Sequence, residues 1–358
     1  MQVSALWWRK LGLCGALLLS CASYAAFGQA SNPTSPAPAA IGNQAGAQSP
    51  ASESRDHLPA SEGSGSITPE PIAQEPSSSD QGGMFVFKKE VEEVFLHATV
   101  TDQHGNLVPR LDRSAFSVFE NGQPQTITSF RREDVPVAIG IVIDNSGSMR
   151  DKRAKVNQAV MNLVRASNPH DEVFVVNFND NPYLDQDFTS DVNLLQVALK
   201  QVSTKGSTAL YDAVVASAVH LDTAHVDKKV LLVITDGEDN MSRDTLEQAS
   251  RKLQQANGPV VYAVGLLGGT EARARQDLQE LADGTGGAAY FPATLDQVDD
   301  LTRTIAHDIR SQYLIAYKPR NQNSKPEFQS IRVEAYAPAY GKLIVRTKSG
   351  YYPPSTSH

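Results

Sequence analysis

Runs of apolar residues that alternate with helical patterns constrain the fold of this chain more than any other feature. The segment Val137–Ile143 (VAIGIVI) is almost continuously apolar, as expected of a strand buried on both faces of a sheet. More strands are predicted at Glu172–Phe178, Val230–Ile234, Val260–Leu266 and Ala288–Phe291. Helices are predicted around Val156–Val164 and at Leu210–Leu221, Leu246–Leu253, Glu271–Ala282 and Leu295–Ile309. The alternation predicts an α/β fold over residues 136–310, doubly wound around a mostly parallel, Rossmann-like sheet.

Shorter strands with a different pattern lie on both sides of this segment. Before it, strands are predicted at Val91–Thr101, Phe116–Phe119 and Gln125–Phe130, and Asn121-Gly122 is a strong hairpin signal. After it, strands are predicted at Gln312–Tyr317, Gln329–Ala335 and Lys342–Thr347. Because three strands alone make a marginal sheet, we expect residues 84–135 and 311–353 to form one small antiparallel β-sandwich, into which the α/β domain is inserted. Two separate β subdomains, one at each end, are the alternative.

The first 28 residues have the pattern of an export signal. Arg9 and Lys10 provide a positive start, Leu11–Ser20 is a short apolar run, and Ala26-Phe27-Gly28 is a small-x-small cleavage pattern. The apolar run is too short to cross a bilayer as a helix. A second interpretation stays open, because Leu18–Cys21 resembles a bacterial lipobox, which would make Cys21 a lipid-anchored N-terminus. The protein is expected to be exported, and to be periplasmic, secreted or anchored to the cell envelope through that cysteine.

Residues 29–83 differ in composition from the rest of the chain. They are rich in Ser, Pro, Ala, Gly and Gln and almost without large apolar side chains. Such a segment cannot bury enough surface to offset its ordering entropy, so we expect a disordered tether. The two cysteines of the chain, Cys14 and Cys21, both precede it, which leaves the predicted folded part without a disulfide or a thiolate metal site.

The loop after the first buried strand carries the segment Asp144–Ser148 (DNSGS). A D-x-S-x-S pattern alone is a weak signal, but open α/β sheets bind ligands in the loops at the carboxyl ends of their strands, where this segment lies. Two other loops supply side chains of the same kind. Thr208 stands shortly before a predicted helix, and Asp236 stands shortly after a predicted buried strand.

Together these loops offer two carboxylates and three hydroxyls, from Asp144, Ser146, Ser148, Thr208 and Asp236. Hard oxygen donors suit Mg²⁺, with Mn²⁺ or Ca²⁺ as alternatives, and do not suit zinc or copper. We expect the two serines to bind the ion directly, the threonine to bind directly or through water, and the two aspartates to bind directly or through coordinated waters. Hydroxyls fill coordination positions without adding charge, so the ion would keep an electrophilic position that attracts an outside carboxylate.

The set resembles the metal-ion-dependent adhesion site of von Willebrand factor A domains, and all five motif positions are filled. The flanks add to this, because Leu111–Pro136, Ser311–Tyr313 and Gly350–Tyr352 are similar to an A-domain-related family abundant in acidobacteria. The resemblance covers roughly residues 88–353. It implies the A-domain fold, a bound divalent cation, and a protein ligand that presents Asp or Glu; it does not identify that ligand.

Other classes of function are weaker interpretations of the same residues. A nucleophilic Ser146 would need a G-x-S-x-G elbow, but residue 144 is Asp. The sequence has no HExxH motif, and its glycine-rich segment Gly284–Gly287 lacks the Lys and Ser/Thr of a phosphate-binding loop. We therefore expect an adhesion or scaffold module and no enzyme, with a hydrolase as the least favoured function. A metal-independent structural or assembly component of the cell envelope is the main alternative. A net charge of −8 argues against nucleic acid as a partner.

Overall fold

The computed structural model describes residues 93–132, 135–200, 203–269, 271–320 and 327–353. The predicted export signal, the predicted tether and residues 84–92 lie outside the described residues. The described residues all belong to one compact unit. Within the described ranges, none of the helices combines the length and the apolar character needed to cross a membrane.

A six-stranded sheet forms the centre of the α/β domain, in the order β10-β9-β8-β5-β6-β7. Its strands are β5 (Val137–Asp144), β6 (Glu172–Phe178), β7 (Pro182–Thr189), β8 (Lys228–Thr235), β9 (Val260–Gly265) and β10 (Ala288–Tyr290). β10, β9, β8, β5 and β6 are parallel, and β7 pairs with β6 in the antiparallel direction. Every residue of β5 is buried, as its continuous apolar run predicts for a strand covered on both faces.

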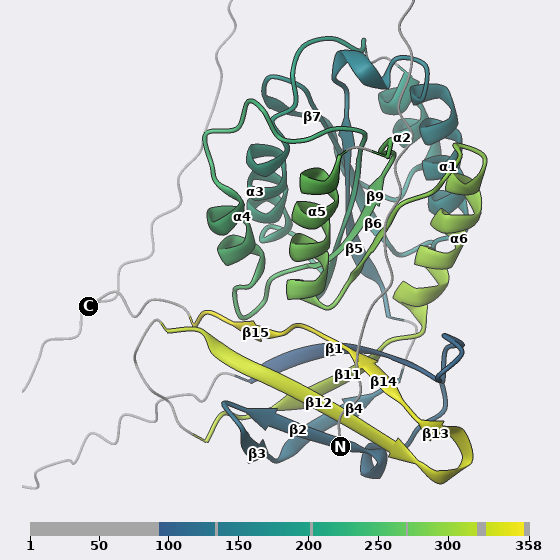
Figure 1. Cartoon of the computed structure of the whole chain (residues 1–358). Helices are drawn as coiled ribbons and strands as arrows, with labels where there is room; N and C mark the ends of the chain where they lie inside the picture. The colour runs from purple at the N-terminus through teal and green to yellow at the C-terminus, as the bar shows by residue number, and fades with distance from the viewer. Residues whose placement is uncertain (1–92, 133–134, 201–202, 270, 321–326, 354–358) are drawn as a thin grey trace, which may run out of the picture. The chain divides into compact units, whose positions relative to one another are not determined.

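Helices cover both faces of this sheet (Figure 1). The face with the Val160 and Ile305 side chains carries α1 (Arg153–Arg165), α2 (Val192–Lys200) and α6 (Gln297–Arg310). The face with the Val214 and Leu278 side chains carries α3 (Leu210–Leu221), α4 (Leu246–Leu253) and α5 (Ala272–Thr285). This arrangement is the predicted doubly wound α/β fold.

The elements β7 and α2 are not among the predicted ones. β7 has the sequence PYLDQDFT, and none of its residues is fully buried. It lies at the edge of the sheet, where a strand can be stable with polar side chains, so its sequence carries little hydrophobic pattern. α2 has apolar residues on its exposed side as well, at Leu194 and Val197, so its sequence VNLLQVALK does not show a single apolar face.

Two antiparallel sheets flank the α/β domain as a small sandwich. One has the order β14-β1-β11-β4, and the other has the order β13-β12-β2-β3, with β15 also paired to β12. The strands are β1 (Val94–Thr101), β2 (Phe116–Glu120), β3 (Gln123–Gln125), β4 (Ile127–Arg131), β11 (Tyr313–Tyr317), β12 (Gln329–Ala337), β13 (Gly341–Lys342), β14 (Ile344–Arg346) and β15 (Gly350–Tyr351). Strands from before and after the α/β domain pair directly, β1 with β11 and β14, and β2 with β12.

Two of the predicted flanking strands are wrong as single strands. The segment Gln125–Phe130 is divided, because β3 pairs with β2 in one sheet while β4 pairs with β11 in the other. The segment Lys342–Thr347 is divided in the same way, because β13 pairs with β12 and β14 pairs with β1. In both places the chain passes from one sheet to the other, a change that side-chain alternation does not mark.

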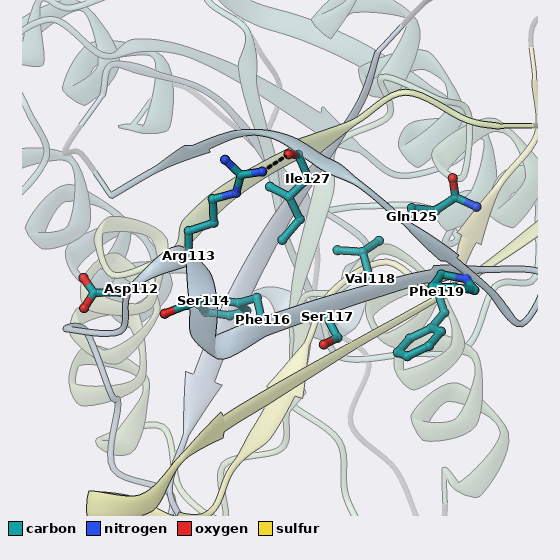
Figure 2. Close-up of a pocket in the computed structure, with 10 residues that line it drawn as sticks. Asp112, Arg113, Ser114, Phe116, Ser117, Val118, Phe119, Gln125 and Ile127 are labelled. Atoms are coloured by element: carbon teal, nitrogen blue, oxygen red, sulfur yellow. Dashed lines mark hydrogen bonds between the residues drawn. The ribbon is translucent and has the colours of Figure 1, made fainter.

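The predicted hairpin joins β2 and β3 at Asn121 and Gly122, whose φ angles are 48° and 76°. Two positive φ values are typical of a type I′ turn, which an Asn-Gly pair adopts readily. A shallow cavity of about 740 Å³ lies beside β2, β3 and the start of β4 (Figure 2). Arg113 donates a hydrogen bond to the carbonyl of Ile127 at its margin. This cavity contains none of the five predicted site residues.

Candidate metal centre

The loops with the predicted site residues leave the sheet at its carboxyl edge. β5 and β8 are parallel neighbours, with Ile143 in register with Ile234. Asp144 is the last residue of β5 and Asp236 follows the last residue of β8, so the two loops begin side by side. The strand order reverses here, because the chain goes from β5 to β6 on one side and later to β8 on the other. Such a switch point is where open α/β sheets place their ligands.

The carboxylate of Asp144 is fully buried, with an exposed fraction of 0%. Its Oδ2 accepts a hydrogen bond from Thr235 Oγ1 at 2.6 Å, and its Oδ1 accepts one from the backbone N of Ser146 at 2.8 Å. Burial raises the pKa of Asp144, these hydrogen bonds lower it, and the negative charge of Asp236 adds to the rise. In the described part of the chain no basic side chain forms an ion pair with this carboxylate. A cation beside it would therefore offset its desolvation.

A chain of oxygen atoms connects the two loops. Ser146 Oγ lies 3.1 Å from Ser148 Oγ, and Ser148 Oγ donates a hydrogen bond to Asp236 Oδ1 at 2.7 Å. Ser148 belongs to the short 3₁₀ turn η2 (Gly147–Met149) that follows β5. Ser146 and Asp236 are buried and Ser148 is exposed, so the chain of oxygens joins two buried residues through one at the surface.

Thr208 reaches the same place from the loop before α3. Asn240 holds its backbone on both sides, because Asn240 Oδ1 accepts from Thr208 N at 2.9 Å and Asn240 N donates to the Thr208 carbonyl at 3.0 Å. A Cβ added to Gly237 would lie 3.8 Å from Thr208 Oγ1, so that hydroxyl is next to the residue that follows Asp236. All three loops therefore meet at the carboxyl edge.

The Thr208 loop is also fixed to the turn after β5. Gly147 N donates a hydrogen bond to the carbonyl of Gly206 at 3.2 Å. Gly206 has a φ of +80°, and an added Cβ would lie 2.6 Å from Asp180 Oδ2, so a side chain does not fit here. Asp180 Oδ1 in turn accepts from the backbone N of Ser207 at 2.7 Å.

Lys152 contributes a positive charge that the sequence reasoning missed. Its Nζ lies 2.6 Å from Asp236 Oδ2 and 3.4 Å from the carbonyl oxygen of Leu266. The Asp236 side chain is 0% exposed, whereas the lysine side chain is 29% exposed. One oxygen of Asp236 thus faces Ser148, and the other faces an ammonium group. The only sign of this in the sequence is the position of Lys152, which lies between the Asp144–Ser148 segment and α1, close to the predicted site residues.

A buried arginine supports the end of β5. Arg153 is 6% exposed, and its Nη1 donates to the carbonyl of Asp144 at 3.3 Å. Its Nη2 donates to Asn177 Oδ1 at 2.5 Å, and Asn177 Nδ2 donates to Asp185 of β7. Burial lowers the pKa of Arg153 to about 10, with nearby Tyr183 and carboxylates opposing the change. The unpredicted edge strand therefore takes part in holding the motif.

The side chains that meet here fit a hard divalent cation by their chemistry. All five offer oxygen, and hydroxyls outnumber carboxylates, as Mg²⁺, Mn²⁺ and Ca²⁺ tolerate. Among the residues that the structure describes, no cluster of three or more His, Cys, Asp or Glu side chains could hold a metal ion. A metal here would therefore depend on the hydroxyls of Ser146, Ser148 and Thr208 together with the two carboxylates.

Comparison with protein families assigns the α/β domain. Residues 138–304 match the family model described as von Willebrand factor type A domain. The chain thus contains a domain with the von Willebrand factor A fold, and the predicted fold class is confirmed. A search of curated proteins found no match.

Three solved structures that resemble this chain are distant from it in sequence. The PilB minor pilin from Streptococcus sanguinis is 15% identical over 51% of this chain and 63% of that chain, with a TM-score of 0.43. BatB from Bacteroides thetaiotaomicron is 20% identical over 48% of this chain and 97% of that chain, with a TM-score of 0.40. A third structure is proximal thread matrix protein 1 from the mussel byssus with a zinc-occupied MIDAS motif. It is 17% identical over 53% of this chain and 50% of that chain, with a TM-score of 0.45. The matched part spans less than two thirds of the pilin.

Proposed function

We propose that the A domain is a metal-dependent protein-binding module, which acts in adhesion or as a scaffold and captures a carboxylate of a partner protein. Asp144, Ser146, Ser148, Thr208 and Asp236 would hold the divalent cation, with Mg²⁺ as the first choice and Mn²⁺ or Ca²⁺ as alternatives. When bound, the cation supplies an electrophilic position for the Asp or Glu side chain of the partner. The protein's own residues make no covalent bond in this function, so we propose no enzymatic activity.

The observation that carries this proposal is the burial of Asp144. Its carboxylate is 0% exposed and has hydrogen bonds from one hydroxyl and one backbone amide. A buried carboxylate with neutral donors is costly unless a cation offsets its charge. The oxygen chain from Ser146 through Ser148 to Asp236 would give such a cation further donors, of which Ser148 belongs to an exposed residue.

The residues around the centre favour a preformed site. Asn240 fixes Thr208 by two hydrogen bonds, Asp180 fixes the neighbouring Ser207, and Arg153 supports the carbonyl of Asp144. Donors that are fixed before the ligand arrives lose little conformational freedom on binding, which increases affinity. A partner would thus find the loops already in place.

A second function is favoured by the Lys152–Asp236 ion pair, at 2.6 Å. An ammonium group on Asp236 neutralises one of the two carboxylates without a metal. In that case the A domain would be a metal-independent structural or assembly component of the cell envelope. Dependence of partner binding on a divalent cation separates the two functions.

We also propose the setting in which the module acts. Residues 1–28 would direct export, residues 29–83 would be a tether, and Cys21 would be a lipid anchor if the lipobox is used. The folded part would comprise residues 84–135 and 311–353 as the sandwich around the A domain at 136–310. The module would then act in the periplasm, on the cell envelope or outside the cell, and its contact with a membrane would be limited to that anchor.

The test of the proposed function is selection of binding peptides from a random displayed library in Mn²⁺. We expect the selected peptides to share an Asp or Glu, to lose binding in EDTA, and to lose it when that residue is changed to Asn or Gln. The variant Asp144→Ala/Ser146→Ala should not bind them. Peptides that bind equally in EDTA, or equally with the amide side chain, would contradict carboxylate capture and support the metal-independent function.

A further inference from the structure

A cleft of about 840 Å³ lies at the amino edge of the six-stranded sheet, opposite the candidate metal centre. One wall includes Pro136, which precedes β5, and the first residues of β8 and β9, Lys228 and Val260. The other wall includes His97 of β1 and Leu314 of β11. Figure 1 shows this edge of the sheet next to the flanking strands. The volume is in the range of roughly 300–1,000 Å³ that is usual for sites of small organic ligands.

Two lysines that line the cleft are withdrawn from solvent. Lys228 is 5% exposed, and Lys348 is half-buried. Lys228 Nζ donates to the carbonyl of Ile309 at 2.5 Å, and Lys348 Nζ donates to the carbonyl of Ala256 at 2.5 Å. Within the described ranges no carboxylate forms an ion pair with Lys348, and its ammonium group donates to a neutral carbonyl oxygen. An ammonium group that is removed from water in this way is stabilised by a nearby anion.

The two ammonium groups share His97 as a neighbour. Burial, and then the positive charges of Lys228 and Lys348, lower the pKa of this imidazole to about 3. Burial lowers the pKa of Lys348 to about 8, so this lysine still carries its proton near pH 7. The cleft therefore presents positive charge beside an uncharged imidazole, and both kinds of group can donate hydrogen bonds to an oxyanion.

The charge of the described part of the lining also favours an anion. Among the lining residues that the structure describes, the basic ones are Arg131, Lys228, Lys229 and Lys348, and the acidic ones are Glu93 and Asp227. Cations thus outnumber carboxylates at this place, although the chain as a whole has a net charge of −8. A cleft with an excess of one sign of charge concentrates ligands of the opposite sign.

We propose that this cleft binds a small organic molecule through a phosphate group, which Lys228, Lys348 and His97 surround. A phosphate group carries close to two negative charges near neutral pH, and lysine is a common phosphate ligand in proteins. The cleft is larger than a phosphate ion needs, and its apolar lining residues Phe95, Val226 and Leu314 can accept the carbon part of the molecule. Such a ligand would contact the A domain and the sandwich together, at the end of the sheet remote from the metal centre.

Calorimetric titration of the full chain with inorganic phosphate and with glycerol 3-phosphate tests this proposal. EDTA is present throughout, so that phosphate on a metal ion cannot contribute. We expect saturable binding of the ester, at least threefold tighter than that of phosphate because its carbon part fills more of the cleft. Lys348→Met should weaken it at least tenfold, and the control Lys342→Met, which removes an exposed lysine of β13, should leave it unchanged. The proposal would be overturned if neither compound binds saturably, or if the Lys348→Met variant binds the ester as tightly as the parent chain does. Equal affinities for phosphate and its ester would overturn the claim that the cleft binds the carbon part of the ligand.

The side-chain resonances of His97 provide a second readout if Lys348→Met does not fold. They are assigned by comparison with His97→Gln, and glycerol 3-phosphate is added to the parent chain. We expect the His97 resonances to shift in proportion to saturation, while those of the exposed His104, which is not part of the lining, stay in place. Resonances of His97 that do not move at concentrations that saturate the calorimetric signal would place the phosphate elsewhere and overturn the proposal.

Discussion

The ammonium group of Lys152 lies 2.6 Å from Oδ2 of Asp236, while Oδ1 of the same carboxylate accepts from Ser148 at 2.7 Å. One aspartate thus connects a fixed positive charge to the donors proposed for a metal ion. A metal on Asp236 has to share that carboxylate with the lysine or displace it. The affinity for the ion therefore depends on a residue outside the five-residue motif.

Replacing Lys152 by Met should strengthen metal binding. The pair is partly exposed and contributes about 1 kcal/mol, so its loss should lower the Kd for Mn²⁺ about fivefold. Titration calorimetry measures this, with Lys155→Met as the control, because Lys155 is exposed and pairs with Asp296 away from the centre. Unchanged or weaker metal binding in Lys152→Met would show that the lysine does not compete with the ion.

Replacing Thr235 by Val should destabilise the fold. Thr235 is 0% exposed and gives Asp144 Oδ2 its hydrogen bond at 2.6 Å, so valine leaves a buried carboxylate oxygen without that donor. We expect a loss of about 1–3 kcal/mol in the free energy of unfolding, measured by urea denaturation in EDTA. Thr235→Ser keeps the hydroxyl and should recover most of the loss. Equal stability of the valine variant would mean that the hydrogen bond is dispensable.

The sandwich and the A domain are joined through Asp308 near the end of α6. This carboxylate accepts from Thr99 of β1 at 2.9 Å, from Tyr262 of β9 at 3.0 Å, and from Arg346 of β14. Arg346→Met leaves a buried carboxylate with the neutral donors Thr99 and Tyr262 and should lower the free energy of unfolding by about 1–3 kcal/mol. The control Arg332→Met removes an exposed pair with Glu334 and should change it by less than about 0.5 kcal/mol. Equal losses in the two variants would contradict this account of the junction.

Lys348 should make the stability of the protein depend on pH. Its pKa is lowered to about 8 in the folded chain, against 10.5 as the ordinary value. Between these two values the unfolded chain binds more protons than the folded chain, so the free energy of unfolding should rise with pH from about 8 to about 10.5. Urea denaturation across this range measures the rise, and Lys348→Met should flatten it. A free energy of unfolding that has the same pH dependence in the parent chain and in Lys348→Met would contradict the assignment.

The central fold could be predicted because its strands are buried on both faces. β5 and β6 have mostly apolar sequences, and the helix between them, α1, repeats apolar residues at helical spacing. The hydrophobic pattern does not predict strands correctly where their side chains are only partly buried. The polar edge strand β7 and the change of sheet between β3 and β4 depend on tertiary pairing, which a local sequence does not record.

The candidate site also contains residues that the sequence marks and residues that it does not mark. The residues Asp144, Ser146, Ser148, Thr208 and Asp236 could be chosen because a short motif and the ends of predicted strands mark them. Their supporting residues have no such marks: Thr235 reads as an ordinary strand residue, Asn240 as a loop residue, and Lys152 as a surface charge. Each acts through a contact between segments that are distant in the sequence, such as the 91 positions that separate Thr235 from Asp144.

Calorimetric titration with Mg²⁺ and Mn²⁺ of the parent chain and of Asp144→Ala/Ser146→Ala tests the central claim most directly. We expect the parent to bind one ion for each chain, and the double variant to lose at least tenfold in affinity while it keeps its circular dichroism spectrum. That result would assign the ion to the carboxyl edge of the sheet. Ion binding of equal strength by the parent and the folded double variant, or none by the parent at millimolar metal, would contradict the metal centre and leave the metal-independent function.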